Sequence, residues 1–136
     1  MIHFYAEEIE FPEIDKKHII VWIKQVAALH DKRVGEISYL FCSDTKILEV
    51  NREFLQHDYY TDIITFDYSE GDRISGDIYI SLDTVQSNAD SFENNYFMEL
   101  HRVIIHGILH LCGQNDKSED EQNEMTQKEN EALELL

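Results

Sequence analysis

Five segments of the chain have the hydrophobic pattern of helices. In residues 14–29 and 95–111, apolar side chains recur three and four positions apart, which is the spacing of one helical face. Ser118 with Glu121 predicts a capping box at the start of the last helix. The expected helices are residues 14–29, a helix after Ser43 or Asp44 that carries Ile47, Leu48, Phe54 and Leu55, residues 82–90, residues 95–111 and a helix that begins near Ser118.

Four further segments fit strands. Between residues 36 and 42 the pattern alternates, which places Ile37, Tyr39 and Phe41 on one face. Residues 70–72 resemble a turn, so the segments on either side of it predict a hairpin. The expected strands are residues 2–6, 36–42, 62–68 and 76–81.

These elements predict an α+β fold, with a small mixed sheet of about four strands packed against about five helices. No repeat, linker or low-complexity stretch interrupts the pattern. Because 136 residues is the usual length of one domain, we expect residues 1–136 to form a single domain with its own core.

The segment from His106 to Asp116, HGILHLCGQND, has the spacing of a metal site. Two histidines four residues apart lie on one face of a helix, and Gly113 lets the chain turn back so that Asp116 offers a third ligand. Three protein ligands leave one position open for water, whose pKa a zinc ion lowers to about 7. The segment therefore predicts a catalytic zinc site made by His106, His110 and Asp116 on the long helix of the C-terminal half.

Other interpretations of these residues stay open. Paired histidines also arise by chance, and a histidine on an apolar helix is more often a hydrogen-bonded core residue. A zincin-like zinc peptidase is a weaker interpretation, because the glutamate of its pattern H-E-x-x-H is the general base and Gly107, which stands there, has no side chain to take a proton. His101 lies about 140° around the helix from His106, so we expect it to be a surface or packing residue.

Three motifs, in order, resemble those of the YbeY family. The histidine segment resembles the signature H-G-x-L-H-L-x-G-x-D-H, residues 51–54 and 61–66 resemble N-x-x-[YF] and T-D-V-L-S-F, and residues 76–81 resemble G-D-I-x-I-S. Met125 also stands where the family often has a methionine. The resemblance implies a metal-dependent endoribonuclease of ribosomal RNA maturation, acting on single-stranded RNA at the 3′ end of small-subunit rRNA.

Two positions depart from the family pattern. Asp116 stands where the family usually has a third histidine, and a carboxylate moves the site towards manganese and other oxygen-preferring ions. Leu55 stands where the family commonly has an arginine, and a leucine cannot contact phosphate; Arg52 is one helical turn earlier. The expected cofactor is one zinc ion per chain, with another divalent transition metal as the alternative.

The charge of the chain argues against tight RNA binding by the protein alone. There are 28 acidic and 11 basic residues, a formal net charge of −17, whereas nucleic-acid binding normally needs a basic surface. Much of the acidity is expected on the solvated face of the last helix, at Glu119, Asp120, Glu121, Glu124, Glu129, Glu131 and Glu134. We therefore expect a ribosome or ribosome-assembly proteins as partners.

The cysteines and the N-terminus indicate a cytoplasmic protein. Cys42 and Cys112 are expected to be buried thiols rather than a disulfide, and Cys112 lies about 120° from the ligand face. The first residues lack the pattern of a signal peptide, and no segment is long and apolar enough to predict a membrane span.

Smaller motifs each have a functional and a structural interpretation. The pair Thr61-Asp62 either lines the active cleft or ends a loop, and Asp77 either orients a metal-bound histidine or follows a glycine that allows close backbone approach. His57 is a fallback third ligand or proton donor. The pair Tyr59-Tyr60 either stacks on an unpaired base or packs.

Three functions follow as hypotheses. The first is the metal-dependent endoribonuclease. The second is a ribosome-assembly binding factor in which a structural metal holds the last helices together and nuclease activity is small or absent. The third is hydrolysis of a small substrate by the same site.

Overall fold

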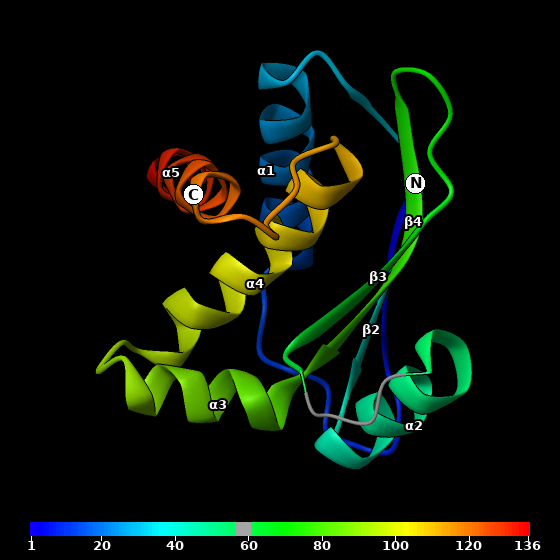
Figure 1. Cartoon of the computed structure of the whole chain (residues 1–136), viewed down its shortest axis with the longest axis vertical. Helices are drawn as coiled ribbons and strands as arrows, with labels where there is room; N and C mark the ends of the chain where they lie inside the picture. The colour runs from blue at the N-terminus through cyan, green and yellow to red at the C-terminus, as the bar shows by residue number, and fades with distance from the viewer. Residues whose placement is uncertain (57–60) are drawn as a thin grey trace.

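Residues 1–56 and 61–136, the part of the chain that the structure describes, contain a four-stranded mixed sheet. Figure 1 shows this computed structural model. The strands are β1 (Ile2–Ala6), β2 (Arg33–Cys42), β3 (Ile63–Asp67) and β4 (Arg73–Ser81), in the order β1-β2-β4-β3. β1, β2 and β4 run parallel, and β3 is antiparallel to β4, which confirms the predicted hairpin.

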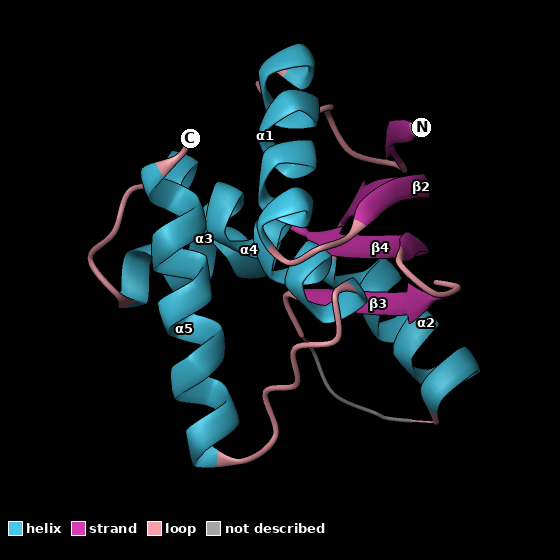
Figure 2. Cartoon of the chain, turned by 90° about the horizontal axis from the view of Figure 1, so that it is seen from above, coloured by secondary structure: helices cyan, strands magenta, loops and turns pink. Residues whose placement is uncertain are grey.

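Five helices occur in the same described ranges, as the sequence predicted. They are α1 (Lys16–Leu29), α2 (Asp44–Leu55), α3 (Leu82–Ser91), α4 (Tyr96–Leu111) and α5 (Glu119–Glu134). α1 and α4 cover one face of the sheet, α2 packs on the other face, and α3 and α5 pack against α4 (Figures 1 and 2). None of the described helices is long and apolar enough to cross a membrane.

Short polar side chains begin two of the helices, α2 and α5, where the sequence predicted. Ser43, rather than Asp44, is the N-cap of α2, because its side chain accepts a hydrogen bond from the backbone of Lys46. The capping box of Ser118 and Glu121 is present at the start of α5. The α+β fold expected from the pattern is therefore confirmed, with β2 and β4 each beginning three residues earlier than predicted.

The core between the sheet and α1 contains the side chains that periodicity assigned to it. Ile37, Tyr39 and Phe41 of β2 are fully buried, as are Ile19 and Ile23 of α1. The thiols of Cys42 and Cys112 are free, and burial raises their pKa values to about 12 and about 11. These thiols are therefore protonated and paired with no other cysteine, as predicted.

The apolar face predicted for α2 is correct only in its first half. Ile47 is buried together with Val50, but Phe54 and Leu55 are 59% and 40% exposed. α2 packs on the outer face of the sheet through Ile47 and Val50, and at its end the ring of Phe54 lies nearly at right angles to the ring of Phe66 in β3. Helical spacing shows which residues share a face, but it does not show how much of that face the rest of the protein covers.

Gly107 allows α4 to lie close to the sheet. A Cβ atom on this residue would be 3.0 Å from Ile78 Cδ1 and 3.1 Å from Ile63 Cδ1. Position 107 therefore faces the core, so a glutamate there would enter the sheet rather than the space beside the histidines. This is the structural reason why the general base of a zinc peptidase has no place in this protein.

Gly76 has a packing role, and Asp77 does not orient a histidine. A Cβ atom on Gly76 would overlap the carbonyl oxygen of Phe66 in the paired strand, as the structural interpretation of this motif required. Asp77 lies on the opposite face of β4 from Ile78 and accepts a hydrogen bond from the Tyr68 hydroxyl at 3.3 Å. Its functional interpretation was therefore wrong.

The buried hydroxyl of Tyr39 ties the sheet to α4, and its removal should lower stability. Tyr39 donates a hydrogen bond of 2.8 Å to the carbonyl of Ile104, in the middle of α4. We expect Tyr39→Phe to lower the free energy of unfolding by about 1 kcal/mol, the net worth of one such bond. Urea unfolding measures this, with Tyr5→Phe as the matched control because Tyr5 is 50% exposed. Equal stabilities of the two variants would contradict the role of this bond.

Candidate metal centre

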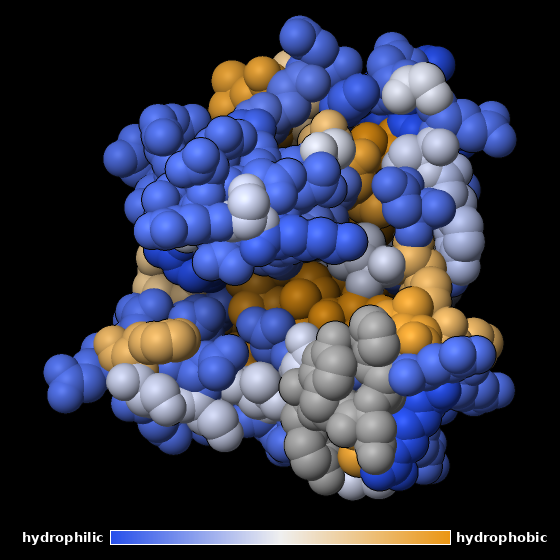
Figure 3. All heavy atoms as spheres, in the orientation of Figure 1, coloured by the Kyte–Doolittle hydropathy of each residue, from blue (hydrophilic) through white to orange (hydrophobic). Residues whose placement is uncertain are grey.

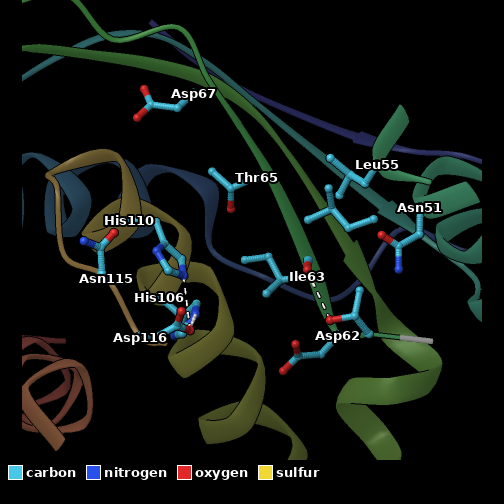
Figure 4. Close-up of a pocket in the computed structure, with 12 residues that line it drawn as sticks. Asn51, Leu55, Asp62, Ile63, Thr65, Asp67, His106, His110, Asn115 and Asp116 are labelled. Atoms are coloured by element: carbon cyan, nitrogen blue, oxygen red, sulfur yellow. Dashed lines mark hydrogen bonds and ion pairs between the residues drawn. The ribbon is translucent and has the colours of Figure 1, made fainter. Parts of the chain in front are cut away.

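Two side chains of α4 and one from the following loop converge on a single point. One ligand atom each from His106, His110 and Asp116 lies within 4.8 Å of the others. Asp116 Oδ2 is 3.3 Å from Nε2 of both histidines (Figure 4). The structure therefore brings together the three residues that the sequence proposed as ligands.

The end of α4 turns the chain so that Asp116 returns to the histidines. Gly113 N–H donates to the carbonyl of His110 at 2.9 Å, and Gln114 N–H donates to that of Leu109 at 3.0 Å. These two bonds form a Schellman motif, in which the residue at the Gly113 position adopts a left-handed conformation. Gly113 has φ of +101°, so the role predicted for it is confirmed.

The loop that carries Asp116 is held by the last helix. Gln114 is buried, and its side-chain amide donates to the carbonyl of Asn115 at 2.8 Å. Lys128 of α5 donates to the side-chain oxygen of Gln114 at 2.5 Å. Asp116 is thus placed by a turn on one side and by α5 on the other.

Glu129 is a residue of the site that the sequence interpretation missed. Its carboxylate accepts a 2.6 Å hydrogen bond from Nδ1 of His106, and it is only 7% exposed, so its assignment to the solvated face of α5 was wrong. The signal was present in the spacing, because Glu129 stands four residues after the buried Met125 and three before the buried Ala132. The exposed acidic residues of this helix are Glu119, Asp120, Glu124, Glu131 and Glu134, as predicted.

The two histidines have opposite electrostatic surroundings. Burial lowers the pKa of His106, but the hydrogen bond and the charge of Glu129, together with Asp116, raise it above its usual value. Burial and the neighbouring His106 lower the pKa of His110 below its usual value. The surroundings of His106 thus favour a positive charge. Those of His110 favour the neutral imidazole, which is the form that binds metals.

The residues fit a divalent ion such as zinc. When neutral His106 donates Nδ1–H to Glu129, its Nε2 has a lone pair directed at the Asp116 carboxylate, and two electron-rich atoms at 3.3 Å need a cation or an added proton between them. Ligands at about 2.0–2.1 Å in tetrahedral geometry are about 3.3 Å apart, which is the spacing observed here. Two imidazoles and a carboxylate are also a known donor set of catalytic zinc.

The centre lies in one wall of a cleft of about 610 Å³. Leu55 and Asn51 stand on the opposite wall, and Thr65 and Asp67 lie along β3 (Figure 4). In the space-filling view, hydrophilic residues cover α5, and hydrophobic residues line the hollow below it (Figure 3). The described residues that line the cleft are Asn51, Leu55, Thr61, Asp62, Ile63, Ile64, Thr65, Asp67, His106, His110, Asn115 and Asp116.

Some of the remaining residues that the sequence suggested for the site line the cleft, and others do not. Thr61 and Asp62 line the cleft, as their functional interpretation required, and burial raises the pKa of Asp62. His101 is a packing residue, because it is buried and its ring lies 4.0 Å from that of Phe97. The predictions for residues 57–60 lie outside the described residues. Arg52, on α2, is not among the described residues that line the cleft.

The fold and the site define a class of protein, an α+β protein in which a group of side chains that could hold a metal ion is built on one helix and the turn that follows it. The family model described as "Endoribonuclease YbeY" matches residues 3–136. The chain therefore belongs to the YbeY family of endoribonucleases.

Curated relatives and a solved structure agree with this assignment. "Endoribonuclease YbeY" of Phocaeicola vulgatus is 66% identical over 136 residues, which cover 100% of this chain and 99% of that protein. "Endoribonuclease YbeY" of Parabacteroides distasonis is 62% identical and covers 99% of this chain and 95% of its own length. The solution structure of a Thermotoga maritima protein has a TM-score of 0.71 at 29% identity, covering 99% of this chain and 88% of that one.

Metal content tests whether the converging side chains hold an ion. We expect the native protein to retain roughly one zinc ion per chain, and His110→Ala to lose it, since two remaining ligands hold zinc poorly. Elemental analysis of the purified proteins measures this, with His18→Ala, an exposed histidine of α1, as the control. Equal metal content in all three proteins would remove the assignment.

Proposed function

We propose that this protein is a metal-dependent endoribonuclease that cleaves single-stranded ribosomal RNA, and that His106, His110 and Asp116 hold its ion. One observation carries the proposal: the ligand atoms of these residues lie within 4.8 Å of one another in the wall of a cleft of about 610 Å³. Membership of a family of endoribonucleases supports RNA as the substrate. We infer that the substrate is rRNA of the small subunit, near its 3′ end, and that residues 1–136 act as one domain.

Zinc is the ion that we propose, because two imidazoles and one carboxylate at these spacings suit it. A divalent ion held there supplies Lewis acidity towards a phosphoryl oxygen and makes a water molecule more acidic. Asp116 adds a negative charge that a third imidazole would not add, so it weakens this acidity and broadens the choice of ion towards manganese.

The other cleft residues suit bases and sugars better than phosphate. Thr65, Asn51 and Asn115 offer neutral hydrogen-bonding groups, and Leu55 and Ile63 offer apolar surface. Among the described lining residues there is no lysine or arginine, so the positive charge that holds the RNA backbone is small. With a net charge of −17, we infer weak intrinsic RNA affinity and a ribosome or ribosome-assembly protein as a platform, in the cytoplasm.

The alternative of a structural metal receives less support from the packing. α5 is joined to the rest of the fold without an ion, by the hydrogen bond of 2.7 Å from the Trp22 indole to the Ala132 carbonyl and by the buried Met125. A metal that only held the last helices together would add little to these contacts. The position of the ligands beside a cleft favours chemistry over support.

Cleavage of RNA is the direct test of the proposed function. We expect the zinc-loaded protein to cut single-stranded rRNA fragments, and His110→Ala to cut at the background rate, because the ion is lost. Gel analysis of end-labelled RNA measures both, with His18→Ala prepared identically to expose a contaminating nuclease. Cleavage that persists in His110→Ala would refute the assignment.

The leucine in the cleft should limit RNA affinity. Leu55→Arg adds a cation to a wall that has none among the described lining residues, so we expect RNA binding to tighten by about 2- to 5-fold, the range of an exposed ion pair. The salt dependence of binding should also steepen, by about 0.7 for each new phosphate contact.

Fluorescence anisotropy across a salt series measures both effects. Leu29→Arg is the matched control, since Leu29 is 64% exposed on α1 and its substitution changes the net charge equally. Equal tightening in the two variants would mean that net charge, and not the cleft, sets the affinity.

A further inference from the structure

We propose that Glu129 is a positioning residue for the metal centre: its carboxylate holds the His106 ring with Nδ1 protonated and Nε2 directed at the ion, and Arg102 holds Glu129 in turn. The inference rests on the proposed function, because it concerns the ligand that His106 would supply.

The first step is the hydrogen bond between the last helix and the metal helix. Glu129 Oε2 is 2.6 Å from His106 Nδ1, and Nε2 of the same ring is 3.3 Å from Asp116 Oδ2. A neutral imidazole has one N–H group and one lone pair. If Nδ1–H donates to Glu129, the lone pair must be on Nε2, which is the atom that faces the other two ligands.

The second step is that Glu129 is itself fixed. Its other oxygen, Oε1, accepts a hydrogen bond of 2.8 Å from Nη1 of Arg102, and Nη2 of Arg102 donates to Asn130 at 2.7 Å. The side chain of Glu129 is 9% exposed and that of Arg102 is 28% exposed. Both carboxylate oxygens therefore have a cationic or N–H partner, and the buried carboxylate has one orientation that satisfies both.

The third step is what this arrangement does to a ligand. A carboxylate on the far nitrogen selects the tautomer, fixes the ring orientation and makes the ligating nitrogen more basic. Among the described residues, the carboxylate beside His110 is that of Asp116, which faces the ligating nitrogen. His106 is therefore the imidazole of the pair that has a carboxylate on its far nitrogen. Because Glu129 comes from α5, the last helix becomes part of the metal centre.

The test compares isosteric and truncated variants with a matched exposed glutamate. The variants are Glu129→Gln and Glu129→Ala, and the control is Glu131→Gln, which makes the same charge change on the exposed side of α5. The first readout is zinc affinity, by competition with a chromophoric chelator. The second is the tautomer of His106 in zinc-free protein at alkaline pH, by nitrogen-15 NMR of labelled histidine.

We expect Glu129→Ala to weaken zinc binding by about 10- to 100-fold, as is typical for loss of such a partner, and to shift His106 away from the Nδ1–H form. Glu129→Gln keeps an oxygen acceptor but loses its charge, so its affinity should lie between those of Glu129→Ala and the native protein. Glu131→Gln should match the native protein in both readouts. If Glu129→Ala does not fold, zinc affinity and the His106 tautomer measured on Glu129→Gln test the proposal.

An unchanged tautomer in the Glu129 variants, or zinc affinities equal to that of Glu131→Gln, would overturn the proposal. Weaker zinc binding with an unchanged tautomer also overturns it, because the effect would then be one of stability alone. Failure of the proposed function looks different: the native protein would not bind zinc or cleave RNA, while the tautomer of His106 would still depend on Glu129.

Discussion

The site depends on one constraint, which is that an imidazole lone pair and a carboxylate oxygen are held against each other. His106 cannot relieve this contact by turning its N–H group towards Asp116, because that group is engaged by Glu129 at 2.6 Å. His110 directs its Nε2 atom at the same Asp116 oxygen. Electron-rich atoms in such a cluster repel one another unless a cation lies among them, so the arrangement is stable with an ion or an added proton and unfavourable without either.

The rest of the fold keeps this cluster in place. Gly107 lets α4 approach the sheet closely, so that the histidines on the same helix emerge at the edge of the core rather than inside it. The glycine turn after the helix brings Asp116 back, and Lys128 holds the loop through Gln114. Each of these features acts on the backbone or on a neighbour of a ligand. The geometry of the centre is therefore a property of the packing of α4 and α5, and not of the ligands alone.

The sequence predicted the features that interactions between nearby residues determine. It did not predict the features that depend on packing between elements far apart in the chain. The sequence alone predicted that His106 and His110 share a helix face and that the chain turns at Gly113, because helix geometry determines both within a few residues. Glu129 was misassigned because an acidic helix resembles a solvated one until its packing partner is known. The exposure of Phe54 shows the same limit, since the spacing of apolar residues in α2 does not show how much of the helix the sheet covers. The RNA substrate, too, came from the resemblance of ordered motifs and not from charge, which argued the other way.

The central claim is that two imidazoles and one carboxylate bind a single ion and leave a coordination position to solvent. Diffraction from crystals of the zinc-loaded protein, with anomalous scattering measured at the zinc edge, tests it most directly. The account predicts one ion bound by Nε2 of His106, Nε2 of His110 and a carboxylate oxygen of Asp116, with no fourth ligand from the protein. An ion whose remaining position is filled by another side chain, or a structure in which Asp116 points away from it, would contradict the account.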